Sequence, residues 1–214
     1  MKILMNSGGI ASTNCFLIVD EPSKTAVLFD APNDTTAILL DEAQSRGLDV
    51  VGLYLTHGHF DHIADHAVVT SRFPAARVLI HPLDEPKLLQ PASQLFPLPF
   101  VIPPRKADGY FADGQNLTIG ALKFQVMHTP GHSPGHVAFY FPDDELLIGG
   151  DLIIGGSIGR TDLPDSDEEA LYDSLRRVMA LPDATQLLPA HVRPTSLMEE
   201  RASNAFVRMA IGLE

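Results

Sequence analysis

The sequence predicts an α+β protein built from two β-sheets that pack face to face, with helices on the outside. The chain runs through strands and then helices, and it repeats this order a second time. Hydrophobic residues make up 45% of its 214 residues, which is enough for a sizeable core. No stretch marks a boundary at which the chain divides, so a single domain over residues 1–214 is expected.

Apolar, β-favouring runs bounded by turn residues predict the strands of both halves. The expected strands are 3–5, 13–19, 25–29, 50–55, 77–81, 117–119, 122–127, 136–141, 146–148 and 185–188. Apolar residues at helical spacing predict helices over 34–46, 61–72, 166–180 and 196–213. Ser166 with Glu169, and Ser196 with Glu199, match the capping box that opens a helix.

Residues 82–104 contain seven prolines, so regular structure is not expected through most of this stretch. Large apolar side chains accompany the prolines, which a solvated linker would lack. A long apolar loop in a compact domain suits the wall of a pocket, or else a packed surface arm or an oligomer contact.

The charge and the amino terminus exclude several classes of protein. A net charge of −12 argues against binding of duplex nucleic acid, which needs a basic face. Residues 6–9 interrupt the first apolar run, so no secretory leader is expected, and no stretch is long enough to span a membrane. Cys15, the only cysteine, lies in a strand-like run, which favours a buried apolar role over a catalytic one. We expect a cytoplasmic protein without nucleic-acid or membrane partners, and the oligomeric state stays open.

Potential metal ligands gather where the strand 50–55 ends, since His57, His59, Asp61 and His62 occupy four of six positions. Loops at the carboxyl ends of strands are where α/β scaffolds place their chemistry. His57 and His59 are two residues apart, so in extended backbone they point to the same side. Imidazole and carboxylate bind zinc, iron or manganese, and the absence of thiolate argues against a soft metal. A solvated, polar helix start explains the cluster poorly.

Three further segments place ligand types at strand ends. His132 lies in a loop rich in Pro and Gly, Asp151 ends an apolar run, and His191 ends another. Each is a weak signal alone, but together with residues 57–62 they indicate a metal centre.

These residues resemble the metallo-β-lactamase superfamily. The His-x-His-x-Asp-His run at 57–62, His132, Asp151 and His191 span most of the chain in that family's order. The resemblance implies an αβ/βα four-layer sandwich with a two-metal site. It implies that one metal is bound by His57, His59 and His132, the second by Asp61, His62 and His191, and both by a bridging Asp151.

The charges of such a site suit hydrolysis. Two divalent ions would be balanced in part by Asp61, Asp151 and a bridging hydroxide, which leaves positive charge for an anionic transition state. A water between two such ions is deprotonated near neutral pH and can attack a carbonyl group, whose oxyanion the metals stabilise. Asp61 and Asp151 are accordingly the expected catalytic carboxylates.

Within the superfamily the chain looks more like the glyoxalase II branch than the true β-lactamases. Asp151, the complete 57–62 run and Gly159-Arg160-Thr161-Asp162 carry this resemblance. The chain resembles small members without the C-terminal helical domain, which in longer enzymes supplies glutathione-binding residues. It departs from them at Ala190-His191-Val192, where such hydrolases often have Gly-His-Gly.

Two arginines are candidates for binding substrate. Arg160 could hold a substrate carboxylate bidentately, or it could pair with Asp162 or Asp165. Arg193 is a weaker candidate of the same kind. Of the other histidines, we expect a solvated His66, structural roles for His81 and His128, and a ligand-orienting role for His136.

The sequence thus predicts a dinuclear hydrolase of a small thioester such as S-lactoylglutathione, with zinc ahead of iron or manganese. One alternative is a mono-iron persulfide dioxygenase, in which His57, His132 and Asp151 hold a single iron. His136 stands where those enzymes tend to have a cysteine, which weighs against this alternative. The other alternative is a metal-binding protein without turnover.

Overall fold

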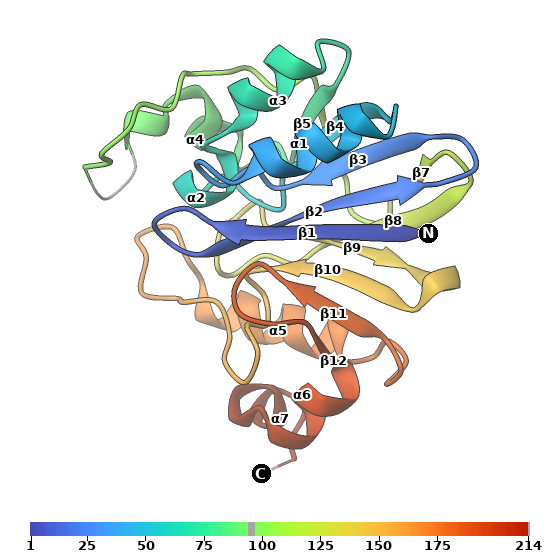
Figure 1. The fold of residues 1–214 in the computed structure, drawn as a ribbon. Coiled ribbons are helices and arrows are strands. Elements are labelled where there is room, and N and C mark those ends of the chain that lie inside the picture. Colours follow the sequence, from blue (N-terminus) through green and yellow to red (C-terminus); the bar gives the residue numbers. More distant parts are fainter. Residues whose placement is uncertain (94–96, 214) are drawn as a thin grey trace. The chain divides into compact units, whose positions relative to one another are not determined.

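The computed structural model describes residues 1–93 and 97–213. The chain forms two compact units, one comprising Met1–Phe111 with Thr118–Leu122, the other Ala112–Leu117 with the residues from Lys123 onwards. The described residues form two six-stranded sheets, most of whose strands are labelled in Figure 1. The single domain expected over residues 1–214 stays a prediction.

The first sheet follows the chain in the order β1-β2-β3-β4-β5-β6. Strands β1 to β3 pair antiparallel, and β3 to β6 pair parallel. The strands are β1 Lys2–Gly8, β2 Thr13–Asp20, β3 Thr25–Phe29, β4 Asp49–Tyr54, β5 Arg77–Ile80 and β6 Gly109–Tyr110. The helices are α1 Thr36–Ser45, α2 Phe60–Ile63, α3 His66–Arg72 and α4 Glu85–Leu89, with a 3₁₀ turn at Pro91–Ser93.

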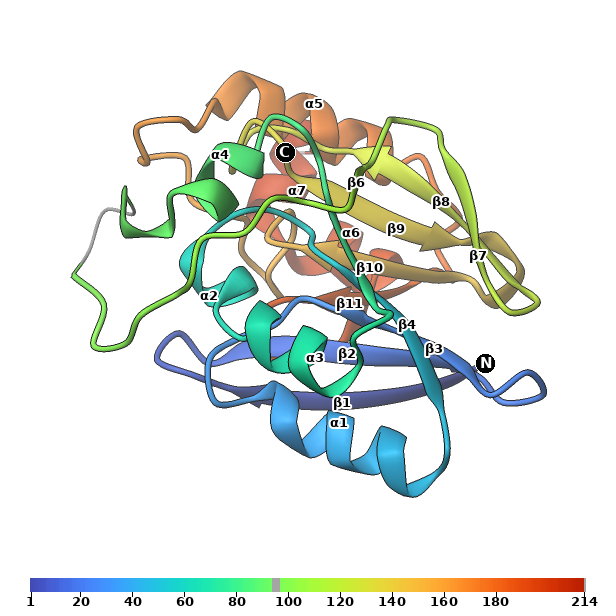
Figure 2. The ribbon, with the colours of Figure 1, turned by 90° about the horizontal axis from the view of Figure 1, so that it is seen from above.

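Helices cover one face of this sheet because alternate strand residues form an apolar surface. Leu17 and Val19 of β2 share one buried cluster with Leu40 of α1. α1 and α3 lie side by side over this face (Figure 2). Cys15 belongs to the same cluster, and burial raises the pKa of its thiol to about 12. Its expected apolar role is confirmed, since such a thiol supplies no thiolate near neutral pH.

The single helix expected over 61–72 is wrong. α2 and α3 are separated at Ala64 and Asp65, and a distant contact explains the break. The Asp65 carboxylate accepts hydrogen bonds from the Thr35 and Thr36 backbone N–H groups and, at 2.8 Å, from the Thr36 hydroxyl. Asp65 therefore caps α1, whose own N-cap residue makes no side-chain cap.

Apolar side chains of the proline-rich stretch 82–104 pack on the core of the first unit. Residues 94–96 of this stretch lie outside the described residues. α4 forms within it because Pro86 occupies the first helical turn, where no backbone donor is needed. Leu88 and Ile102 are buried in the core. His66 donates from Nε2 to the Pro103 carbonyl oxygen at 2.8 Å and is 2% exposed, so the expectation of a solvated His66 is wrong.

The second sheet has the order β12-β11-β10-β9-β8-β7. β10 pairs parallel with β11 and antiparallel with β9. The strands are β7 Asn116–Ile119, β8 Leu122–His128, β9 Val137–Phe141, β10 Leu146–Gly150, β11 Gln186–Pro189 and β12 Thr195–Ser196. The helices are α5 Glu168–Val178, α6 Leu197–Ser203 and α7 Ala205–Ala210, with a 3₁₀ turn at Pro142–Asp144. Leu171 and Leu175 of α5 share a buried cluster with Leu147 of β10.

The helix ends of the second unit confirm one capping prediction, correct the other and divide the last predicted helix. Ser196 accepts the Glu199 N–H at 3.1 Å, as predicted. The N-cap of α5 is Asp167, because the Ser166 hydroxyl donates to the Leu163 carbonyl oxygen instead. The helix expected over 196–213 is broken at Asn204, whose side chain caps α7. Among the described residues, no helix has the length and apolar character needed to cross a membrane.

The buried His66 predicts a specific pH dependence of stability. Burial lowers the pKa of His66, whereas in the unfolded chain it titrates near its ordinary value of about 6.5. Its contribution to stability is therefore present above about pH 6.5 and lost as the pH falls through the lower, folded pKa. His66→Gln keeps a donor for Pro103 without titrating, so its free energy of unfolding should fall less than the parent's between about pH 7.5 and 5.5.

Urea denaturation at the two pH values measures this difference. His128→Gln is the matched control, because His128 also donates from Nε2 to a proline carbonyl, that of Pro134, but is only partly buried. Equal losses of stability in His66→Gln and the parent would contradict the prediction.

Candidate metal centre

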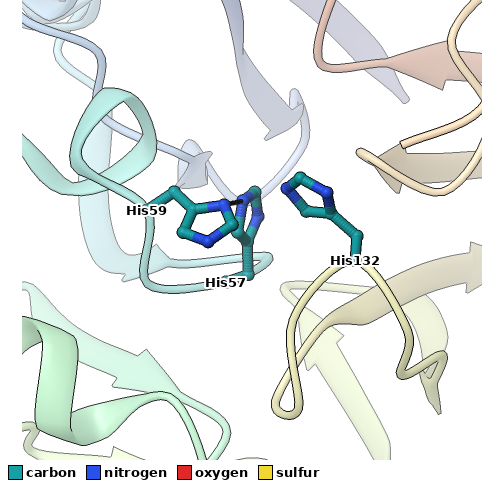
Figure 3. Close-up of side chains that lie close together, drawn as sticks. All are labelled: His57, His59 and His132. Atoms are coloured by element: carbon teal, nitrogen blue, oxygen red, sulfur yellow. Dashed lines mark hydrogen bonds between the residues drawn. The ribbon is translucent and has the colours of Figure 1, made fainter. Parts of the chain in front are cut away.

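The loop after β4 in the first unit brings the predicted ligands of the 57–62 run into contact. His57 and His62 are buried, whereas His59 and Asp61 are partly exposed. His57 Nε2 and His59 Nδ1 are 2.9 Å apart (Figure 3), and the ring centroids of His57 and His62 are 3.9 Å apart. Asp61 Oδ2 accepts the Thr13 hydroxyl at 2.7 Å and lies 3.4 Å from His62 Nε2.

Asp30, which the sequence did not single out, holds this loop together. Its buried carboxylate accepts the Thr56 N–H and the Thr56 hydroxyl, both at 2.8 Å, and lies 2.9 Å from His62 Nδ1. Because a carboxylate only accepts, His62 donates from Nδ1 and keeps the lone pair on Nε2. The Thr56 hydroxyl proton goes to Asp30, so Thr56 Oγ1 accepts the Nδ1–H of His57 at 3.1 Å. Both histidines thus carry their lone pair on Nε2.

The second unit groups its three predicted ligands around one oxygen atom. Asp151 Oδ2 lies 3.4 Å from His132 Nε2 and 3.4 Å from His191 Nε2. His132 lies in the loop between β8 and β9 (Figure 3). It donates from Nδ1 to the Arg160 carbonyl oxygen at 3.0 Å, which leaves its lone pair on Nε2. Asp151 follows β10, and His191 comes shortly after the parallel β11.

The 3.4 Å separations are longer than good hydrogen bonds and match the spacing of ligands on one ion. With bonds of about 2.0–2.2 Å to nitrogen or oxygen, two ligands of a tetrahedral ion lie about 3.3–3.5 Å apart. The same spacing recurs for His62 with Asp61 and for His132 and His191 with Asp151. The donor types and these three 3.4 Å spacings therefore fit a divalent metal.

The remaining histidines have other hydrogen-bond partners. His136 accepts the Asp151 N–H on Nε2 at 3.0 Å, so its Nδ1–H is the one donated to Thr129 Oγ1 at 2.9 Å. His136 thereby fixes the backbone of Asp151, in the orienting role predicted for it. His128 bonds the Pro134 carbonyl oxygen, and His81 Nδ1 accepts the Leu83 N–H at 3.4 Å.

Both candidate substrate-binding arginines lie in exposed ion pairs. The Arg160 side chain binds Asp162 bidentately at 2.6 and 2.7 Å, which is the ion pair that the sequence offered as the alternative to substrate binding. The Arg160 carbonyl oxygen orients His132. Arg193 pairs with Glu199 at 2.8 Å, beside a hollow of about 490 Å³ that Gly155, Val192 and Thr195 also line. Their contact with substrate stays a prediction.

Val192, directly after His191, has a backbone conformation that suits glycine. Its φ is +62°, and such a value is a marked outlier for a β-branched residue. The glycine that similar hydrolases often carry at this place adopts this conformation without strain. Val192 therefore stores backbone strain beside a predicted metal ligand.

Val192→Gly and Val192→Ala separate this strain from packing, because both variants lose the valine side chain and only glycine relieves the strained Cβ. The strain relieved is about 1–2 kcal/mol and the entropy cost of glycine about 0.5–1 kcal/mol. The midpoints of these ranges predict a glycine variant more stable than the alanine variant by roughly 0.75 kcal/mol. Chemical denaturation of both proteins measures the difference. An alanine variant of equal or greater stability would show that Val192 is unstrained.

Comparisons with known proteins agree with this architecture. A family model described as "Metallo-beta-lactamase superfamily" matches residues 8–191. Hydroxyacylglutathione hydrolase GloC of Haemophilus influenzae is 30% identical over 206 residues, which cover 91% of this chain and 92% of that protein. The probable metallo-hydrolase YqgX of Bacillus subtilis is 31% identical, with 95% of each chain covered.

Solved structures resemble the chain over nearly its whole length. BLEG-1 B3 metallo-beta-lactamase has a TM-score of 0.88 at 32% identity, covering 96% of this chain and 99% of that one. TTHA1623 in a di-iron-bound form has a TM-score of 0.83 at 36% identity, covering 95% and 99%. ETHE1 from Myxococcus xanthus has a TM-score of 0.78 at 26% identity, covering 100% and 92%. The predicted fold class is confirmed, and the chain belongs to the metallo-beta-lactamase superfamily.

Proposed function

We propose that this protein is a dinuclear metal-dependent hydrolase of small thioesters, of the hydroxyacylglutathione hydrolase type. One observation carries the metal part of this proposal. His57, His62 and His132 each direct Nδ1 at a protein oxygen, which leaves Nε2 as the donor atom, as in histidines that bind metals. The similarity to GloC of Haemophilus influenzae, over nearly the full length of both chains, supports the thioester part.

We assign the ligands as the sequence predicted them. His57, His59 and His132 would hold one ion, Asp61, His62 and His191 the other, and Asp151 both. Asp151 Oδ2 is equally distant from His132 and His191, which supports the assignment of Asp151 as a residue that would help to hold both ions. Bound divalent ions supply a water-derived nucleophile near neutral pH and electrostatic stabilisation of developing negative charge. Zinc suits these donors, and the di-iron form of TTHA1623 makes iron the metal to compare with it.

The chain's own residues would keep these donors in place. Asp30 fixes the tautomer of His62, the Arg160 carbonyl oxygen fixes that of His132, and His136 fixes the main chain of Asp151. Asp61 and Asp151 would place negative charge beside the ions. We place the activity in the cytoplasm, as the sequence predicted.

β-Lactam hydrolysis is a second candidate, because BLEG-1 is described as a B3 metallo-beta-lactamase and covers nearly the whole chain. A β-lactam and a thioester both present an electrophilic carbonyl to the same nucleophile. Persulfide oxidation is disfavoured, because a single iron would leave the ordered Asp61 and His62 without a role.

Asp151→Ala should lose more metal than Asp61→Ala, because Asp151 is proposed to contact both ions and Asp61 only one. Both variants should lose turnover. Metal analysis of protein purified without added metal should give close to two ions per chain for the parent. Asp143→Ala, which removes an exposed carboxylate, is the control for nonspecific metal binding. An Asp151→Ala protein with both metals and parental rates would refute the bridging role.

The substrate assay compares three reactions on one preparation. We expect release of thiol from S-lactoylglutathione, with a high KM and a less affected kcat, because Asp162 and Glu199 already occupy the candidate substrate-binding residues Arg160 and Arg193. We expect no oxygen uptake with glutathione persulfide and only slow hydrolysis of a chromogenic cephalosporin. Rapid oxygen consumption without thioester cleavage would favour the dioxygenase, and faster cleavage of the cephalosporin would favour the β-lactamase.

A further inference from the structure

Gly58 separates the two predicted ligands His57 and His59, and its backbone is held from outside the loop. Residues 57–59 belong to no helix or strand, so no ladder partner satisfies their backbone groups. The Gly58 N–H donates to Asp84 Oδ2 at 2.7 Å, and Asp84 is fully buried. A buried, charge-assisted hydrogen bond of this length is stronger than a neutral one.

Asp84 makes this contact in place of a local one. It occupies the N-cap position of α4, where an Asp side chain ordinarily accepts a backbone N–H of the first helical turn. The Asp84 side chain makes no such cap, and its carboxylate bonds the Gly58 loop instead. An Asp at this position would ordinarily cap the helix. In the structure its carboxylate instead accepts a hydrogen bond from the loop that carries His57 and His59.

The first turn of α4 lies directly against Gly58. A Cβ atom at residue 58 would come within 2.8 Å of the Asp84 carbonyl oxygen and 2.9 Å of Lys87 Cβ. Glycine is thus required by close approach of the backbone, but it also makes the link between His57 and His59 flexible. The Asp84 hydrogen bond restricts that flexibility. Lys87, whose Nζ is 3.5 Å from Asp84 Oδ1, supplies the compensating charge.

We propose that Asp84 is a positioning residue, which fixes His57 and His59 as metal ligands through the Gly58 N–H. This inference rests on the proposed function only in taking His57 and His59 to bind metal. Binding requires His57 Nε2 and His59 Nδ1 to converge, and their 2.9 Å separation depends on the backbone between them. Partners of ligands typically contribute about 10- to 100-fold to metal affinity.

The test measures Co²⁺ affinity by chelator competition and the visible spectrum of the Co²⁺ protein, without substrate. Asp84→Ala should bind Co²⁺ roughly 10- to 100-fold more weakly, with an altered spectrum. The double variant Asp84→Asn with Lys87→Met keeps an acceptor for Gly58 and removes the ion pair, so its affinity and spectrum should stay close to the parent's. Gly58→Ala, whose Cβ would force α4 away, should weaken Co²⁺ binding even if Asp84→Ala fails to fold.

Glu85→Ala is the matched control for loss of stability. The Glu85 carboxylate accepts the Ala107 N–H at 3.1 Å and the Tyr110 hydroxyl at 2.7 Å, so it secures α4 without contacting Gly58. The Glu85→Ala variant should have a lower denaturation midpoint and the same Co²⁺ affinity as the parent. Three results would overturn the inference. The first is parental Co²⁺ affinity in both Asp84→Ala and Gly58→Ala, and the second is an equal loss of Co²⁺ affinity in Asp84→Ala and Glu85→Ala. The third is a parent protein that binds no Co²⁺. Failure of thioester hydrolysis alone, with these affinity differences intact, would overturn only the proposed substrate.

Discussion

The loop after β4 depends on hydrogen bonds to two buried carboxylates, and the rest of the candidate site in the first unit depends on that loop. Asp30 accepts the Thr56 N–H and Asp84 accepts the Gly58 N–H, so the donors on either side of His57 are both satisfied by side chains. Without these acceptors, two backbone donors would be buried unsatisfied, at about 1–3 kcal/mol each. The same bonds fix the direction in which His57 and His59 leave the backbone.

The order of strands explains why these carboxylates reach the loop. β3 and β5 flank β4 in a parallel arrangement, and Phe29 and Leu79 both pair with Tyr54. Asp30 follows directly after β3, and Asp84 lies four residues beyond the end of β5. Since parallel strands end at one edge of the sheet, both side chains arrive beside the segment that follows Tyr54. The crossovers through α1 and through α2 with α3 thus place two acceptors where the loop has unpaired donors.

In the second unit, hydrogen bonds from distant residues also hold the predicted metal ligands, although different elements supply them. Asp151 and His191 follow the parallel strands β10 and β11, and His132 lies in a loop between two antiparallel strands. His136 holds the Asp151 N–H and the Arg160 carbonyl oxygen holds His132, so hydrogen bonds to backbone groups position these two ligands. Val192 keeps a strained backbone directly after His191, which places a local stability cost next to the candidate site.

The sequence by itself determined the features that depend on neighbouring residues. The positions of ten of the twelve strands in the described residues, the clustering of His57 to His62, and the strand-end places of Asp151 and His191 follow from periodicity and spacing, and the superfamily follows from the order of these ligands. The two-residue strands β6 and β12 were not predicted, because such short strands carry no periodic pattern. Tertiary structure decided what depends on distant residues. Asp65 caps a helix thirty residues earlier in the chain, His66 holds Pro103, and Asp84 leaves its own helix uncapped to bond Gly58. A short polar side chain has similar local options at many positions, so only the approach of a distant backbone donor or acceptor selects among them.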